Sequence, residues 1–160
     1  FADLWRAGVP DWTRQAIATA PADLVLVTPH WGPNMAVEPV PHVRRAACEL
    51  VEAGASLVAG HSAHVFQGVQ GRVLYDLGDF LDDYRVDPEL RNDLGLLWLV
   101  ELDREGPRQI EAVPLKLDYC HTRLATGDDA SWICRRFRAA CAALGTTIAE
   151  EEDRLVVRLR

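Results

Sequence analysis

The pattern that most constrains this chain is a strand, a helix and a second strand within about forty residues. Residues 23–28 are a continuous apolar run of strand length, which predicts a strand covered on both faces. Residues 42–53 carry apolar side chains at the spacing of one helical face, and Gly54 then provides a typical helix end. Residues 56–59 form a second short apolar strand. Two strands joined in this way are normally parallel, so the pattern predicts an α/β fold.

The rest of the chain predicts a second sheet and two more helices. Asp11 is expected to be the N-cap of a short surface helix over residues 11–20, and residues 129–144 predict an amphipathic helix. Further strands are expected at residues 65–69, 73–75, 94–102, 109–117 and 155–159. A hairpin turn at residues 103–106 makes an antiparallel second sheet the expected arrangement. No repeat or composition break marks a second domain, so one domain, or most of one, is expected.

The balance of charge excludes one class of partner. The chain has 17 Lys and Arg residues against 24 Asp and Glu residues, a net charge of −7 that repels a phosphate backbone, so nucleic acid is not an expected partner. The apolar runs are far shorter than the roughly 20 residues that cross a bilayer, so no membrane segment is expected in this chain. Because the chain opens on Phe1 rather than Met, a fragment is expected, and cytoplasm and cell envelope both stay open as its location. The cysteines expected to be buried free thiols, rather than a disulfide or metal site, are Cys48, Cys120, Cys134 and Cys141.

Three of the five histidines follow the two strands of the predicted strand–helix–strand unit. His30 comes after the first strand, and His61 and His64 come after the second. Because the carboxyl ends of neighbouring parallel strands meet at one edge of a sheet, the three side chains are expected to converge. Neutral imidazole binds zinc, iron, manganese or nickel, and paired ions of this kind activate water in phosphoester hydrolysis. A single histidine at a strand end is more often a capping or surface residue than a ligand. His42 is expected to be a surface residue at the start of a helix, and His121 is expected to be structural.

Three segments containing these histidines resemble a known family. Residues 28–35 contain His-Trp-Gly, residues 60–68 contain Gly-His-x-x-His-Val, and residues 74–80 contain Tyr-x-Leu-Gly-Asp-Phe. In this order and at about these separations, the segments resemble the CapA family of poly-γ-glutamate capsule-synthesis proteins, within the calcineurin-like metallophosphoesterase superfamily. The resemblance covers roughly residues 23–117.

The resemblance implies a fold and a metal site. The implied fold is the C-terminal part of a two-sheet sandwich with flanking helices, so residues 1–160 are expected to be a single partial domain. By the resemblance, His30 is the isolated histidine ligand, and His61 and His64 are the closing pair, for one or two divalent ions such as Mn, Fe or Zn. The wider superfamily has one residue fewer between the last two histidines. No segment before His30 resembles the family's N-terminal motifs, so about half of a dinuclear site is expected here.

Polar and aromatic neighbours of the histidines give further candidates. Asp76 and Asp79 are expected either to orient a ligand histidine or, for Asp79, to cap a turn. Trp31 borders a substrate cleft or fills the core. Asn34 is a candidate for binding a phosphoryl or carboxylate oxygen, and residues 82–83 are expected to be a solvated turn rather than a catalytic pair. The candidate substrate-binding residues are Trp31, Asn34 and Asp79.

Three functional hypotheses follow. The first is a metal-dependent hydrolase in which His30, His61 and His64 are catalytic ligands and the substrate is a phosphoester or related compound. The second is a non-catalytic component that binds or helps export an anionic capsule polymer, although the charge of −7 opposes such binding unless metal ions mediate it. The third is a fragment with no function alone, whose exposed apolar strand edges predict poor solubility.

Overall fold

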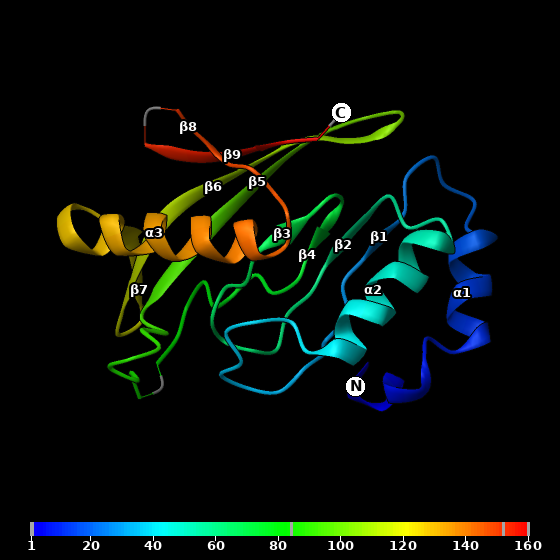
Figure 1. Ribbon diagram of the computed structural model, residues 1–160, viewed down its shortest axis with the longest axis horizontal. Helices are drawn as coiled ribbons and strands as arrows, with labels where there is room; N and C mark the ends of the chain where they lie inside the picture. The colour runs from blue at the N-terminus through cyan, green and yellow to red at the C-terminus, as the bar shows by residue number, and fades with distance from the viewer. Residues whose placement is uncertain (1, 84, 152, 160) are drawn as a thin grey trace.

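The computed structural model describes residues 2–83, 85–151 and 153–159. Two β-sheets lie next to each other with helices flanking them (Figure 1). The first sheet has the order β1-β2-β4-β3, with strands β1 (Leu26–Val27), β2 (Leu57–Ala59), β3 (Val69–Gln70) and β4 (Val73–Leu74). The second has the order β5-β6-β9-β8 with β7 paired to β6, and its strands are β5 (Leu94–Asp103), β6 (Gly106–Asp118), β7 (His121–Leu124), β8 (Ala149–Glu151) and β9 (Arg154–Arg158). The helical elements are the 3-10 helix η1 (Ala2–Ala7) and the α-helices α1 (Asp11–Ala18), α2 (Pro41–Glu52) and α3 (Gly127–Ala143).

The predicted strand–helix–strand unit is confirmed. β1 pairs with β2 in parallel, with Leu26 opposite Leu57, and α2 connects the two strands. One face of α2 is buried against the first sheet, where its side chains share a core cluster with Val58 and Tyr75. The buried residues of this helix face are Val43, Ala46, Ala47 and Leu50.

A second core cluster joins the two sheets. It combines side chains of the first sheet, such as Leu74, with side chains of the second sheet, such as Ile110. Phe137 of α3 is fully buried in the same cluster, so α3 packs against both sheets. The α/β class, the two-sheet arrangement and the antiparallel hairpin of β5 and β6 are therefore as predicted.

The first strand differs from the prediction. Only Leu26–Val27 forms strand, and Leu26 is 60% exposed rather than covered on both faces. The physical reason is the sheet order, which places β1 at one end of the first sheet. A continuous apolar run predicts a strand but does not say whether that strand lies at the centre or the edge.

The segment expected as a strand at residues 65–69 is mostly a buried loop. Val65 and Phe66 are each 1% exposed, but strand β3 begins only at Val69. Gly68 lies against α3, where an added Cβ would be 2.6 Å from the Ala140 carbonyl oxygen. Tertiary packing rather than strand pairing therefore buries these residues.

Several local predictions were wrong at the surface. Pro10 rather than Asp11 occupies the N-cap of α1, and Asp11 pairs with Arg14 inside the helix. All four cysteines are free thiols as predicted, but only Cys141 is buried and Cys134 is partly buried. The other two cysteines, Cys48 and Cys120, are exposed.

Strands β7 and β8 were not predicted because both are mostly exposed and lack apolar alternation.

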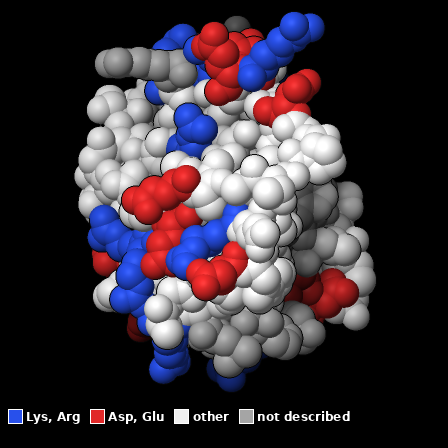
Figure 2. All heavy atoms as spheres, turned by 90° about the vertical axis from the view of Figure 1, so that its right-hand side faces the viewer, with Lys and Arg blue, Asp and Glu red and all other residues white. Residues whose placement is uncertain are grey.

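The face formed by α1 and α2 carries charges of both signs. Figure 2 shows acidic and basic side chains interspersed there rather than segregated. Glu49 lies 3.5 Å from Arg14 and 3.9 Å from Arg45, so the charges form a mixed cluster. Among the residues that the structure describes, no helix is long and apolar enough to cross a bilayer.

Candidate functional site

His30 and His61 meet where the two parallel strands end. The backbone N–H of His61 donates to the Pro29 carbonyl oxygen at 3.1 Å, and that of Trp31 donates to the His61 carbonyl oxygen at 3.0 Å. These bonds form an isolated parallel bridge between His30 and His61. The two Nδ1 atoms lie 3.2 Å apart, and the ring centroids are 5.0 Å apart. Backbone pairing thus brings together two histidines separated by thirty residues, as the sequence predicted.

Tight packing beneath the two histidines fixes their loops. Trp31 is 2% exposed, and its indole N–H donates to the Tyr75 carbonyl oxygen at 2.8 Å. A Cβ added to Gly60 would lie 2.2 Å from the indole nitrogen and 2.4 Å from that carbonyl oxygen. Only glycine fits at position 60. Of the two roles considered for Trp31, the structure places it in the core below the site.

His64, the third candidate histidine, contacts Asp79. Its Nδ1 atom is 3.1 Å and 3.2 Å from the two carboxylate oxygens. His64 has φ 62°, a left-handed conformation that costs a non-glycine residue about 1 kcal/mol or more. The backbone N–H of Met35 donates to the Ala63 carbonyl oxygen at 2.8 Å, which ties the loop after β1 to the loop that carries His64. Of the two roles considered for Asp79, the geometry matches the one in which it orients a histidine.

Asp76 holds the loop that carries His64 rather than a histidine itself. It is 2% exposed, and its carboxylate accepts the backbone N–H of Ala63 at 2.8 Å and that of Gly78 at 2.9 Å. Burial raises the pKa of Asp76 to about 6, although both amide hydrogen bonds favour the charged form. Asp76 therefore acts through the backbone.

Burial also changes the pKa values of His61 and Asp79. It lowers the pKa of His61, and the nearby His30 lowers that pKa further. His61 is therefore favoured as the neutral imidazole, which is the form that binds metals. Burial raises the pKa of Asp79, while His64 opposes the shift.

The distance between His30 and His61 fits two ligands of one ion. Nitrogen ligands at roughly 2.0–2.1 Å from a tetrahedral ion lie about 3.3 Å from each other. The observed separation of 3.2 Å between the Nδ1 atoms is close to this value, and it also suits a direct hydrogen bond between the rings. In the described residues, however, no group of three or more His, Cys, Asp or Glu side chains is arranged to hold a metal ion. The structure brings His30 and His61 into contact with each other, and His64 into contact with Asp79.

A cleft opens beside His64. Its volume is about 320 Å³, and its walls include Asn34, His64, Arg85 and Asn92. Asn92 is 4% exposed; its side chain accepts the backbone N–H of Asp87 at 2.7 Å and donates to the Arg85 carbonyl oxygen at 3.3 Å. A buried amide therefore shapes the wall that presents Arg85.

The sequence predicts only part of this cleft. Asn34 is among the predicted binding residues, but Arg85 and Asn92 are not, because no periodic pattern marks an irregular loop. Asp82 was expected in a solvated turn, whereas it is partly buried, lines the cleft and accepts the Asn92 side chain at 3.1 Å. Asp83 is exposed as expected.

The amino-acid sequence is similar to those of known proteins. Residues 4–84 match the family model for the bacterial capsule synthesis protein PGA_cap. The chain is 27% identical over 147 residues to a probable polyglutamine synthesis accessory protein of Mycobacterium tuberculosis, an alignment that covers 85% of this chain and 38% of that protein. It is 29% identical over 143 residues to the capsule biosynthesis protein CapA of Bacillus anthracis, covering 86% of this chain and 34% of that protein. It is 36% identical over 100 residues to the PGA biosynthesis protein CapA of Bacillus subtilis, covering 60% of this chain and 26% of that protein.

The matched region contains every candidate residue named from the sequence. His30, His61, His64 and Asp79 all lie within residues 4–84, which make up half of the chain. The chain spans 38% or less of the length of these curated relatives. The chain therefore belongs to the bacterial capsule synthesis protein family PGA_cap.

Proposed function

We propose that this chain supplies part of a metal-dependent hydrolase site used in capsule synthesis, with His30 and His61 as ligands. The observation that supports this most is the separation of 3.2 Å between their Nδ1 atoms at the carboxyl ends of two parallel strands. The lowered pKa of His61 also favours the neutral form that a ligand needs. A divalent ion such as Mn, Fe or Zn would supply a Lewis acid there.

Residues of the neighbouring cleft would bind the substrate and exchange a proton with it. His64, held by Asp79, presents a ring to the cleft and is suited to bind or exchange a proton with a substrate oxygen. Arg85 and Asn34 line the same cleft and provide donors for a phosphoryl or carboxylate group. Such a division of roles agrees with a phosphoester or related substrate.

Metal binding tests the proposal without depending on activity. His30→Ala and His61→Ala are each expected to reduce Mn²⁺ or Zn²⁺ binding, measured by calorimetry and by metal content after dialysis, by at least about tenfold. His121→Ala is the matched control, because His121 is an exposed histidine on β7. Equal metal binding by the wild type and both ligand variants would contradict the proposal.

Hydrolysis is the second measurement. In a protein that carries this chain with the full length of its relatives, His61→Ala should reduce turnover of a generic phosphodiester, while His121→Ala should not. Loss of metal binding without any hydrolysis in the wild type would retain the metal site but remove the hydrolase.

A second candidate function is binding of an anionic capsule polymer without chemistry. The names of the relatives favour it, since they describe synthesis and, for the mycobacterial protein, an accessory role. Sedimentation with poly-γ-glutamate in the presence of a chelator separates the two candidates. Binding that needs no metal favours this function, and binding that requires the metal favours the first.

A further inference from the structure

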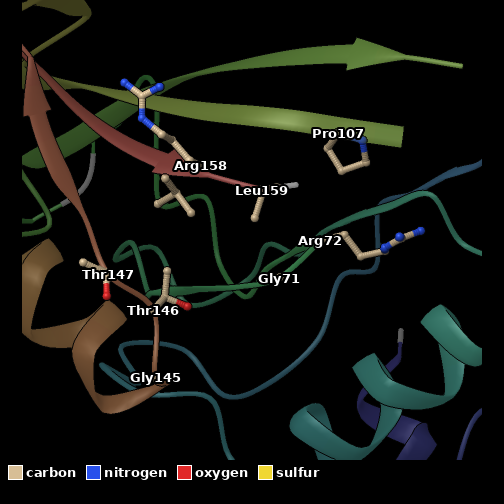
Figure 3. Close-up of a pocket in the computed structure, with 9 residues that line it drawn as sticks. Gly71, Arg72, Pro107, Gly145, Thr146, Thr147, Arg158 and Leu159 are labelled. Atoms are coloured by element: carbon tan, nitrogen blue, oxygen red, sulfur yellow. The ribbon is translucent and has the colours of Figure 1, made fainter. Parts of the chain in front are cut away.

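A second cavity lies at the junction of the two sheets, and we call it the seam cavity. Its volume is about 490 Å³, which is in the usual range for small-ligand sites. Figure 3 shows that its walls come from the turn between β3 and β4, the start of β6, the loop after α3 and the end of β9. The lining residues include Arg72, Pro107, Thr146, Thr147 and Arg158.

The seam cavity lies at the opposite edge of the first sheet from the histidines. β2 and β4 are parallel, with Val58 opposite Val73, and His61 follows the carboxyl end of β2. Arg72 precedes the amino end of β4 and accepts the backbone N–H of Val58 at 2.9 Å. The two sites therefore lie at different ends of the same pair of parallel strands.

The charge of the seam cavity has one sign. Arg72 and Arg158 are its charged lining residues, and its lining includes no carboxylate. Four other cavities in the described part of the chain are each lined by at least one Asp or Glu. In a chain with a net charge of −7, a cavity lined by two arginines and two threonines favours an anion over a cation.

Arg158 already forms an ion pair with a carboxylate outside the cavity lining. It pairs with Glu151, and the two side chains are 64% and 47% exposed. Exposed pairs of this kind contribute only about 0–1 kcal/mol, so another anion can replace Glu151 at low cost. Both arginines are exposed, and in Figure 3 their guanidinium groups point away from each other and from the space between the lining residues. Closing on a ligand therefore requires a change of side-chain rotamer rather than of backbone.

We propose that the seam cavity binds a carboxylate or phosphate group of an anionic ligand, with Arg72 and Arg158 as the charged donors and Thr146 and Thr147 as neutral donors. The site goes beyond the hydrolase proposed above, because it lies at the other edge of the sheet and needs no metal.

Calorimetry with two probes tests this inference. Inorganic phosphate and γ-linked pentaglutamate are titrated separately into the protein at low salt, with a chelator present. Arg72→Gln and Arg158→Gln are each expected to weaken binding about fivefold, and added salt should weaken it further. Glu151→Gln is expected to strengthen binding about threefold, because it removes the carboxylate that competes for Arg158.

Arg123→Gln is the matched control. Arg123 also pairs with an exposed carboxylate, that of Asp118 at 2.7 Å, and the two side chains are 47% and 43% exposed. This variant should bind both probes as the wild type does. Misfolding cannot produce the tighter binding expected for Glu151→Gln. The test therefore stays decisive even if an arginine variant folds poorly.

The titration results either support the anion site or overturn it. Binding of phosphate alone, or of pentaglutamate alone, with loss in both arginine variants supports the site and identifies the source of the anionic group. If neither probe binds the wild type more tightly than about 10 mM, the inference is wrong. It is equally wrong if the Arg72 and Arg158 variants bind as tightly as the Arg123 control.

Discussion

The His30–His61 pair and the His64–Asp79 pair are held by different kinds of structure. The first pair is joined by backbone hydrogen bonds that extend the parallel pairing of β1 and β2. The second depends on a loop in which His64 has a positive φ and the buried carboxylate of Asp76 holds the backbone. Sheet geometry therefore positions one pair, and irregular loop packing positions the other. The two should respond differently to substitution.

The largest loss of stability from a substitution is expected for Gly60→Ala, which disrupts the His30–His61 pair. The added Cβ would lie 2.2 Å from the Trp31 indole nitrogen and 2.4 Å from a backbone oxygen, so the strand end must move. We expect a loss of about 3 kcal/mol in the free energy of unfolding, together with loss of metal binding at His61. Urea unfolding and calorimetry measure the two effects.

Gly145→Ala is the control for this change. Gly145 has φ 75° but an added Cβ meets no atom within 4 Å, so only a conformational cost of about 1 kcal/mol is expected. Equal effects of the two substitutions would show that the contact with Trp31 is not what makes glycine necessary at position 60.

The next largest loss of stability from a substitution is expected for Asp76→Ala, which disrupts the loop of the His64–Asp79 pair. It leaves the buried backbone N–H of Ala63 without its partner, at a cost of about 2 kcal/mol in the free energy of unfolding. Histidine ring NMR signals should then change for His64 and stay nearly constant for His61. Equal changes at both histidines would mean that the two pairs are a single unit.

The protonation of Asp76 predicts a pH dependence. Its pKa rises from an ordinary 3.8 to about 6, so the folded protein keeps a proton that the unfolded chain has already lost between these values. The unfolded chain thus binds fewer protons, and stability falls as pH rises from about 4 to 6. Over this range the wild type should lose about 3 kcal/mol more than Asp76→Asn in the free energy of unfolding. Parallel curves for the two proteins in urea titrations at several pH values would contradict this assignment.

The smallest effect on stability is expected from Asp79→Asn. The contact between Asp79 and His64 is partly exposed, so the free energy of unfolding should fall by about 0.5 kcal/mol. Any activity that depends on the orientation of His64 should fall about tenfold or more. A kinetic assay beside a thermal melt separates the two quantities, and a change in stability alone would limit Asp79 to a structural role.

The sequence predicted the first pair better than the second for a physical reason. Parallel strands end at a common edge, so the apolar runs before His30 and His61 were enough to place these residues together. His64 was expected to join them, but its direction depends on loop dihedrals and on Asp76, which no local pattern encodes. The edge position of Leu26 and the loop burial of Phe66 also follow from packing between distant segments. Arg85 and the seam cavity were not foreseen for the same reason.

Anomalous diffraction from crystals soaked in Mn²⁺ or Zn²⁺ tests directly whether His30 and His61 are ligands of one ion. A peak is expected within bonding distance, roughly 2.0–2.2 Å, of Nδ1 of both His30 and His61, with no such peak in His61→Ala crystals. Metal bound elsewhere in the wild type, with the two imidazoles still in contact with each other, would contradict the assignment of this pair as ligands.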